Sequence, residues 1–220
     1  DAQESRGLGD VYKRQFLEIG QDVALSGKYV EDAVNDGVRQ AYENFRKSSV
    51  HPLSRKNSGD NTPAIIHTRV VKGDKVKVSC MMKGFGSENM SRLFMLTPAD
   101  GVEGVVEKVV ETVKDAGSCP CPPVILGVGV GGTMEKAAIM SKHALLSDLD
   151  KKNPDEYLSS LEKEMLEKIN ALGIGAEGFR GDVTALRVFI ETENTHIAGL
   201  PVAVTVQCHC SRHGERIIEG

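Results

Sequence analysis

Two cysteine-containing segments hold the residues best suited to metal chemistry. In the first, Cys119 and Cys121 are followed by two prolines, which remove backbone donors and stiffen the chain beside a thiolate. In the second, Cys208 and Cys210 stand at the end of an apolar run, among histidines and an arginine. Soft sulfur ligands beside cationic groups suit a metal cluster next to an anionic substrate, whereas inert buried cysteine is the plainer interpretation.

These thiols leave the kind of metal open. Cys119, Cys121, Cys208 and Cys210 could together hold a structural zinc, although their C-x-C spacing is tighter than the usual C-x₂₋₄-C knuckle. The chain has five cysteines, and its start does not resemble an export signal. An odd number in that context argues against a disulfide framework and for metal binding, catalysis or burial.

Two glycine-rich segments and one histidine are further candidates. KGFGSEN, residues 83–89, frees the backbone around Gly86 and Ser87 to approach a ligand, and it could equally be an ordinary polar loop. Residues 127–132 contain G-x-G-x-x-G, but no βαβ return strand with a terminal acidic residue follows, which argues against a nucleotide. A carboxylate-binding turn and tight strand–helix packing both remain open there. His196 precedes the last long apolar run, and a lone histidine is more often structural than functional.

Apolar periodicity predicts the elements that must position these groups. The apolar runs predict strands over 16–19, 64–71, 75–82, 92–96, 124–130, 183–191 and 200–207. Helical spacing predicts helices over 28–47, 102–116, 133–146 and 154–172. Residues 72–74 should close an antiparallel hairpin, and residues 48–62 should form a long loop. This pattern predicts an α/β (mixed α+β) fold in two lobes, with mixed sheets and flanking helices.

Composition bounds the class of protein. The 220 residues are 40% hydrophobic, which is ample for a core, and they carry a net charge of −4 without a sustained basic run. Nucleic acid is therefore not expected as a partner. The apolar runs are too short to cross a bilayer, so no membrane association and a cytoplasmic location are expected. Residues 1–15 resemble a foreign or disordered terminal segment, and the folded domain is expected to span 16–220.

Five segments in a fixed order resemble one enzyme family. They are FLEIGQDV from residue 16, RKNSGDNTPAIIH from residue 55, KGFGSEN from residue 83, CPPVILGVGVGG from residue 121 and THIAGLPVAVTVQCH from residue 195. Together they resemble the alpha subunit, or N-terminal catalytic domain, of class I (iron–sulfur dependent) fumarate hydratases and the related L(+)-tartrate dehydratases. The resemblance extends over nearly all of the chain from Phe16 onward.

The resemblance implies a hydro-lyase with a [4Fe–4S] cluster held by three cysteines, whose open iron acts as a Lewis acid toward a small dicarboxylate substrate. By motif, Cys121 and Cys208 match two cluster ligands, and His196 matches a catalytic residue that contacts the substrate. Gly86 and Ser87 match the substrate-binding segment. A beta subunit or C-terminal domain is implied as the partner that supplies the base, in a homodimer or α₂β₂ assembly. A zinc-stabilised binding or assembly module without catalysis is the alternative.

The front of the chain departs from the family pattern. Family members carry a CQDTG motif shortly before the segment equivalent to Phe16, and residues 11–15 stand in its place here. We therefore expect this chain alone to lack the third cysteine ligand and to be inactive. Cys80, Cys119 and Cys210 match no family ligand and are expected to be small buried side chains. Fumarate and tartrate are not distinguished, because contacts to the extra hydroxyl lie partly in the beta part.

Overall fold

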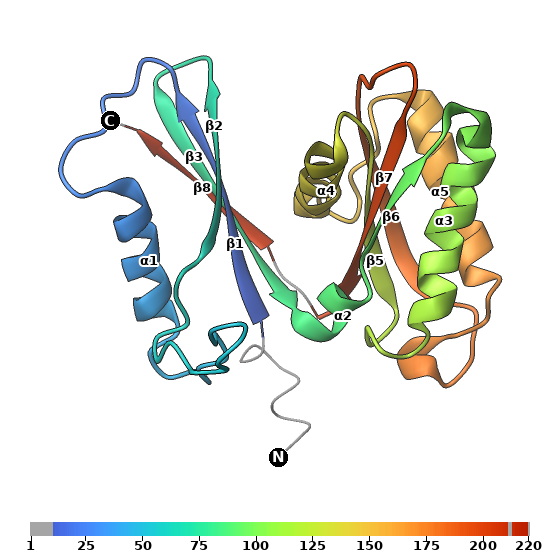
Figure 1. Ribbon diagram of the computed structural model, residues 1–220, viewed down its shortest axis with the longest axis horizontal. Helices are drawn as coiled ribbons and strands as arrows, with labels where there is room; N and C mark the ends of the chain where they lie inside the picture. The colour runs from blue at the N-terminus through green and yellow to red at the C-terminus, as the bar shows by residue number, and fades with distance from the viewer. Residues whose placement is uncertain (1–10, 211–212, 220) are drawn as a thin grey trace. The chain divides into compact units, whose positions relative to one another are not determined.

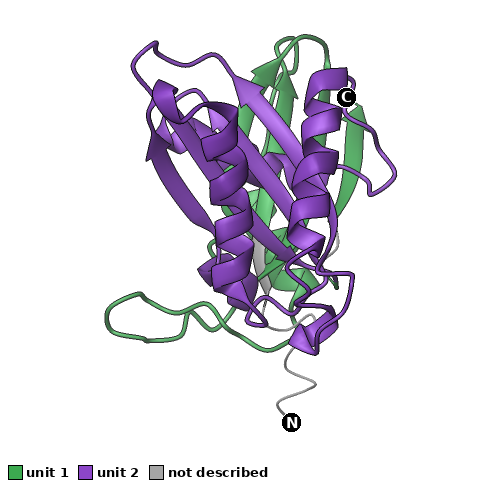
Figure 2. Cartoon of the chain, turned by 90° about the vertical axis from the view of Figure 1, so that its right-hand side faces the viewer, with its two compact units in different colours: residues 1–85, 210–220 green, residues 86–209 purple. Residues whose placement is uncertain are grey.

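The chain divides into two compact units, each with its own four-stranded mixed sheet (Figure 2). The structure is a computed structural model that describes residues 11–210 and 213–219. Both units combine helices and strands, which confirms the predicted α/β class and the two lobes. No helix in the described ranges is long and apolar enough to span a membrane. The units are unit 1, Asp1–Phe85 with Cys210–Gly220, and unit 2, Gly86–His209.

Unit 1 is built on a sheet with one helix. Its elements are β1 (Val11–Gly20), α1 (Val30–Ala41), β2 (Ile65–Val71), β3 (Lys75–Gly84) and β8 (His213–Glu219) (Figure 1). The strand order is β2-β1-β3-β8. β1 is parallel to β2 and antiparallel to β3, and β3 is antiparallel to β8. β8 was not predicted, because its exposed and largely polar residues show no apolar run.

The predicted hairpin between β2 and β3 is wrong, because β1 lies between these two strands. The short link between them instead crosses the end of β1. There the Gln21 backbone N–H donates to the Val71 carbonyl at 2.7 Å, and the Asp22 N–H donates to the Gly73 carbonyl at 3.0 Å. Glycine at position 20 permits this crossing, since a Cβ on Gly20 would lie 2.4 Å from the Gly73 carbonyl oxygen.

Two predicted boundaries and one predicted loop also change. β1 begins at Val11 rather than at residue 16, so residues 11–15 belong to the sheet, and the first ten residues of the predicted foreign segment lie outside the described residues. α1 ends at Ala41, well before the predicted end at residue 47. The predicted KGFGSEN loop is wrong: its first two residues complete β3, and the other five form the short helix α2 (Phe85–Asn89).

Unit 2 is a sheet of order β4-β7-β5-β6 with helices on both faces. α3 and α5 lie on one face and α4 on the other (Figure 1). β5 is parallel to β6 and antiparallel to β7, and β7 is antiparallel to β4. The predicted strands and helices of this unit are confirmed to within a few residues. They are β4 (Arg92–Leu96), α3 (Gly101–Ala116), β5 (Val124–Gly131), α4 (Met134–His143), α5 (Glu156–Asn170), β6 (Ala185–Glu193) and β7 (Leu200–Cys208).

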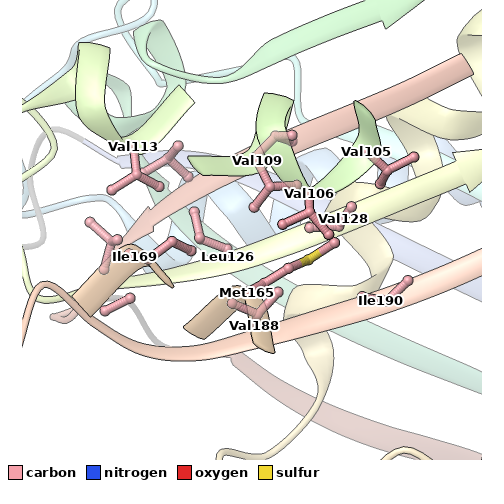
Figure 3. Close-up of a cluster of buried hydrophobic side chains, with 14 of the residues drawn as sticks. Val105, Val106, Val109, Val113, Leu126, Val128, Met165, Ile169, Val188 and Ile190 are labelled. Atoms are coloured by element: carbon pink, nitrogen blue, oxygen red, sulfur yellow. The ribbon is translucent and has the colours of Figure 1, made fainter. Parts of the chain in front are cut away.

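The core of unit 2 lies between the sheet and the pair α3 and α5 (Figure 3). Val105, Val109 and Val113 repeat every fourth residue along α3, and all three are buried. Met165 and Ile169 contribute from α5 and are fully buried. Each such side chain stabilises the fold by about 1.5–3 kcal/mol relative to an exposed one. This cluster makes the sheet a firm support for groups at its ends.

On the opposite face of β5, two glycines allow α4 to pack closely against the strand. A Cβ on Gly127 would lie 2.0 Å from the Ser141 carbonyl oxygen, and a Cβ on Gly129 would lie 2.1 Å from the Ala137 carbonyl oxygen. Successive residues of a strand face opposite sides, so these glycines alternate with valine and leucine that face the core. The interpretation of tight strand–helix packing is therefore confirmed for these two glycines.

Candidate metal and substrate site

Cys121 and Cys208 meet at one end of the unit 2 sheet. Cys208 is the last residue of β7 and pairs with Val124, the first residue of β5, while Cys121 lies just before β5. The Cys208 Sγ lies 3.6 Å from the Cys121 carbonyl oxygen, to which the thiol donates. Cys208 is buried and Cys121 is partly exposed. The antiparallel pairing of β5 and β7 thus brings together the two predicted ligands, which are 87 positions apart in sequence.

Cys121 is held in an uncommon backbone conformation. Its φ of 54° lies in the left-handed region, which costs a non-glycine residue about 1–3 kcal/mol and persists only where the surroundings enforce it. Hydrogen bonds at Cys121 and at the following residue enforce this conformation. The Cys121 N–H donates to the Ser118 carbonyl at 3.1 Å, and the Glu177 N–H donates to the Pro122 carbonyl at 2.8 Å. Gly178 packs against the same segment, where a Cβ would lie 2.5 Å from the Ser118 Cβ.

His209 joins this pair of cysteines. Its Nδ1 lies 3.2 Å from the Cys121 carbonyl oxygen and 3.8 Å from the Cys208 Sγ. The sequence patterns predict cationic residues beside the thiols but assign His209 no role of its own. The sequence signal that could have identified His209 is its position directly after Cys208, a candidate ligand at a strand end.

Gly86 and Ser87 lie near the first cysteine segment. A Cβ on Gly86 would have the Cys119 carbonyl oxygen as its nearest neighbour, at 3.5 Å, so α2 lies against the turn that leads to Cys121. Ser87 is buried. The following turn is tied to the sheet, because the Val206 N–H donates to the Ser91 Oγ at 3.2 Å. The structure therefore places the predicted substrate-binding segment at the same end of the sheet as the two thiols.

An ion pair between Lys142 on α4 and Glu88 on α2 was not predicted. The Lys142 side chain is only 10% exposed and that of Glu88 is 26% exposed, so the pair is largely shielded from water. It connects α4 directly to the helix that carries Gly86 and Ser87. No local pattern distinguishes Lys142 from an exposed lysine of the same helix such as Lys136, because its burial arises from packing between α2 and α4.

His196 lies at the other end of the sheet. It precedes β7, whereas Cys208 ends that strand, and nine residues at about 3.3 Å each separate the two ends by roughly 26–30 Å. Within a single chain, His196 therefore lies far from Cys121 and Cys208. His196 is exposed, and its Nδ1 accepts from the Ala198 N–H at 3.2 Å. A role for His196 toward a substrate stays a prediction.

The surroundings of His196 are apolar. His196 and Thr195 border a pocket of about 420 Å³ at the end of the sheet, whose other lining includes Leu158, Leu161 and the highly exposed Ile197. This lining contains no lysine, arginine, aspartate or glutamate, so the pocket does not have the composition of a dicarboxylate site.

The glycine turn after β5 makes its hydrogen bonds within the protein. The Gly132 N–H donates to the Glu193 carbonyl at 3.2 Å, and the Thr195 hydroxyl donates to the Gly132 carbonyl at 2.9 Å. At the start of α4, the Glu135 carboxylate accepts from its own backbone N–H and from the Thr133 hydroxyl, and both bonds lower the pKa of Glu135. These contacts favour a structural role for this turn over a carboxylate-binding one.

The remaining thiols differ from expectation. Cys80, Cys119 and Cys210 are exposed, so the expectation that they are small buried side chains is wrong. Across residues 11–210 and 213–219, no group of three or more histidine, cysteine, aspartate or glutamate side chains converges as a metal site.

Thiol, imidazole, hydroxyl and carboxylate groups thus lie near one end of the mixed sheet of unit 2. A family model described as Fumarate hydratase (Fumerase) matches residues 12–217. The chain therefore belongs to the fumarate hydratase family, and its class is that of the hydro-lyases. This assignment confirms the resemblance of the five sequence segments.

Curated relatives agree with the family assignment. A Methanocaldococcus jannaschii protein, provisionally named L(+)-tartrate dehydratase subunit alpha, is 43% identical over 213 residues, which are 93% of this chain and 74% of the relative. The L(+)-tartrate dehydratase subunit alpha of Escherichia coli O157:H7 is 30% identical over 210 residues, 92% of this chain and 69% of the relative. That of Escherichia coli UTI89 is 31% identical over 206 residues, 90% of this chain and 67% of the relative.

Proposed function

We propose that this chain is the cluster-binding part of a cytoplasmic [4Fe–4S] hydro-lyase that dehydrates tartrate or hydrates fumarate. The observation that carries the proposal is the meeting of Cys121 and Cys208 at one sheet end, with Cys208 Sγ 3.6 Å from the Cys121 carbonyl oxygen. Sulfur donors of this kind suit an iron–sulfur cluster. The donor chemistry therefore fits two of the three thiolates that the family resemblance implies.

When bound, such a cluster would supply a Lewis acid for the leaving hydroxide. The chain's own residues would hold the cluster and orient the substrate. Cys121 and Cys208 would anchor the cluster, and the backbone at Gly86 with the Ser87 hydroxyl would position the substrate beside it. The firm packing of the sheet against α3 and α5 would keep the two cysteine segments in register.

The assembly is part of the proposal. The relatives are named as alpha subunits, which supports a beta part as the partner that supplies the base and further carboxylate contacts. His196 is too far from Cys208 along β7 to touch the same substrate in one chain. A substrate contact by His196 would thus require a second copy, as in the predicted homodimer or α₂β₂ assembly. The names of the relatives make tartrate the first substrate to test.

Anaerobic reconstitution with ferrous iron and sulfide tests the metal site. We expect a chain extended at its front by a CQDTG-containing segment to bind about four irons and labile sulfides, and the 220 residues alone to bind no stable four-iron cluster. Cys208→Ala should abolish cluster binding in the extended chain, and Cys119→Ser should leave it unchanged.

Two results would contradict this proposal. A stable four-iron cluster on the 220 residues alone would remove the need for a third ligand from the family motif. One zinc per chain, with Cys119→Ser as damaging as Cys208→Ala, would instead support the zinc-stabilised module. Iron, sulfide and zinc analysis of the same preparations distinguishes these outcomes.

A further inference from the structure

His209 occupies a position between the two candidate ligands that the proposed chemistry does not use. Its Nδ1 lies 3.2 Å from the Cys121 carbonyl oxygen and 3.8 Å from the Cys208 Sγ. The imidazole is carried on the residue directly after β7, and the carbonyl belongs to the segment directly before β5. One side chain therefore connects the two segments that must stay together if their thiols are to share a metal.

The chemistry of the contact defines the tautomer of His209. A carbonyl oxygen can only accept a hydrogen bond, so Nδ1 must carry the hydrogen in its contact with Cys121. In a neutral imidazole, Nε2 then has no hydrogen and keeps its lone pair. The contact thus selects one of two tautomers, which is an observable property of the metal-free protein.

The hydrogen bond from His209 to the Cys121 carbonyl would become more important if the two thiols bound a metal. In the structure the Cys208 thiol also donates to the Cys121 carbonyl, at 3.6 Å. A metal-bound thiolate has no S–H, so it cannot make this bond and becomes an acceptor instead. The Nδ1–H of His209 would still donate to the Cys121 carbonyl. The same Nδ1 lies 3.8 Å from the Cys208 Sγ. Hydrogen bonds of this kind to ligating groups orient them and tune the metal.

The backbone of Cys121 adds a reason for such a contact. Its left-handed φ of 54° persists only if neighbouring groups enforce it. The Glu177 N–H donates a hydrogen bond to the Pro122 carbonyl, and the His209 Nδ1–H donates one to the Cys121 carbonyl. These two bonds together define the direction of the peptide groups that follow the ligand.

We propose that His209 is a positioning residue that holds Cys121 and Cys208 in their metal-binding arrangement through the Nδ1–H donated to the Cys121 carbonyl. The inference rests on the proposed metal site and adds a supporting residue to it. It assigns His209 no contact with substrate. Its removal should weaken metal binding even when both cysteines are present.

The test uses the chain extended at its front by the CQDTG-containing segment, together with Co²⁺, whose thiolate charge-transfer absorbance reports sulfur ligation. We compare His209→Leu, which has no donor, with His209→Asn, whose amide N–H can replace Nδ1–H. His51→Leu, an exposed histidine of unit 1, is the matched control. Because loss of an outer hydrogen bond costs about 10–100-fold in metal affinity, we expect that loss in His209→Leu, at most about threefold in His209→Asn and no change in the control.

A second readout needs no metal. Two-bond proton–nitrogen correlation spectra of the histidine-labelled chain should show His209 as the Nδ1–H tautomer. The Nε2–H tautomer, or equal Co²⁺ affinity in His209→Leu and wild type, would overturn the role of His209 and leave the metal site standing. Absence of thiolate charge transfer in the extended chain, with or without Cys208→Ala, would overturn the metal site and this inference together. Circular dichroism of each variant verifies that the fold is retained.

Discussion

Replacing Gly129 with alanine should push α4 away from β5. The new Cβ would lie 2.1 Å from the Ala137 carbonyl oxygen and 2.8 Å from the Ser141 backbone nitrogen. Both atoms belong to the helix backbone, so no side chain can rotate aside, and α4 would have to move by about 1 Å. Overpacking of this kind costs about 1–3 kcal/mol, and we expect the upper end because the contact is so short.

Thermal unfolding followed by circular dichroism measures the effect. For a chain of this size, a loss of about 3 kcal/mol corresponds to a Tm lower by roughly 6–12 °C. Gly37→Ala in α1 is the matched control, since a Cβ there meets nothing within 4 Å. That change should leave stability unchanged or raise it by up to about 1 kcal/mol, because alanine favours a helix. A Gly129→Ala protein that melts within about 2 °C of wild type would refute the described packing of α4 on β5.

Three further changes test other contacts. Lys142→Met removes the partner of Glu88 and should destabilise the protein by about 1–2 kcal/mol, measured by urea unfolding; an unchanged midpoint would contradict the ion pair. The Arg39 side chain and hydrogen bonds from Thr62 lower the pKa of Asp60, so its stabilising contribution is present above about pH 4 and is lost at lower pH. Asp60→Asn should therefore show a smaller fall in Tm between about pH 5 and pH 3 than wild type, and an equal fall would count against this assignment. Asp155→Ala removes the side chain that caps α5 and should cost about 1 kcal/mol in the same unfolding assay.

Local patterns in the sequence were sufficient for most of unit 2. The four-residue repeat of Val105, Val109 and Val113 predicts α3 and the face that it buries. The apolar run of β5 and the charged helix α5 are equally local signals. The family motifs also identify Cys121 and Cys208 as a pair of candidate ligands from the sequence alone. Such features follow from side-chain type and spacing, which a linear pattern contains.

Strand order and strand ends were decided by the tertiary structure. Apolar runs identified β2 and β3, yet they could not show that β1 lies between these strands, because pairing depends on the whole sheet. The antiparallel pairing of β7 with β5 places Cys208 beside the Cys121 segment and leaves His196 at the far end. The burial of Lys142 and the contact of His209 with the Cys121 carbonyl likewise join residues far apart in sequence. A sequence pattern specifies which residues form an element, but only folding in three dimensions determines which ends of those elements meet.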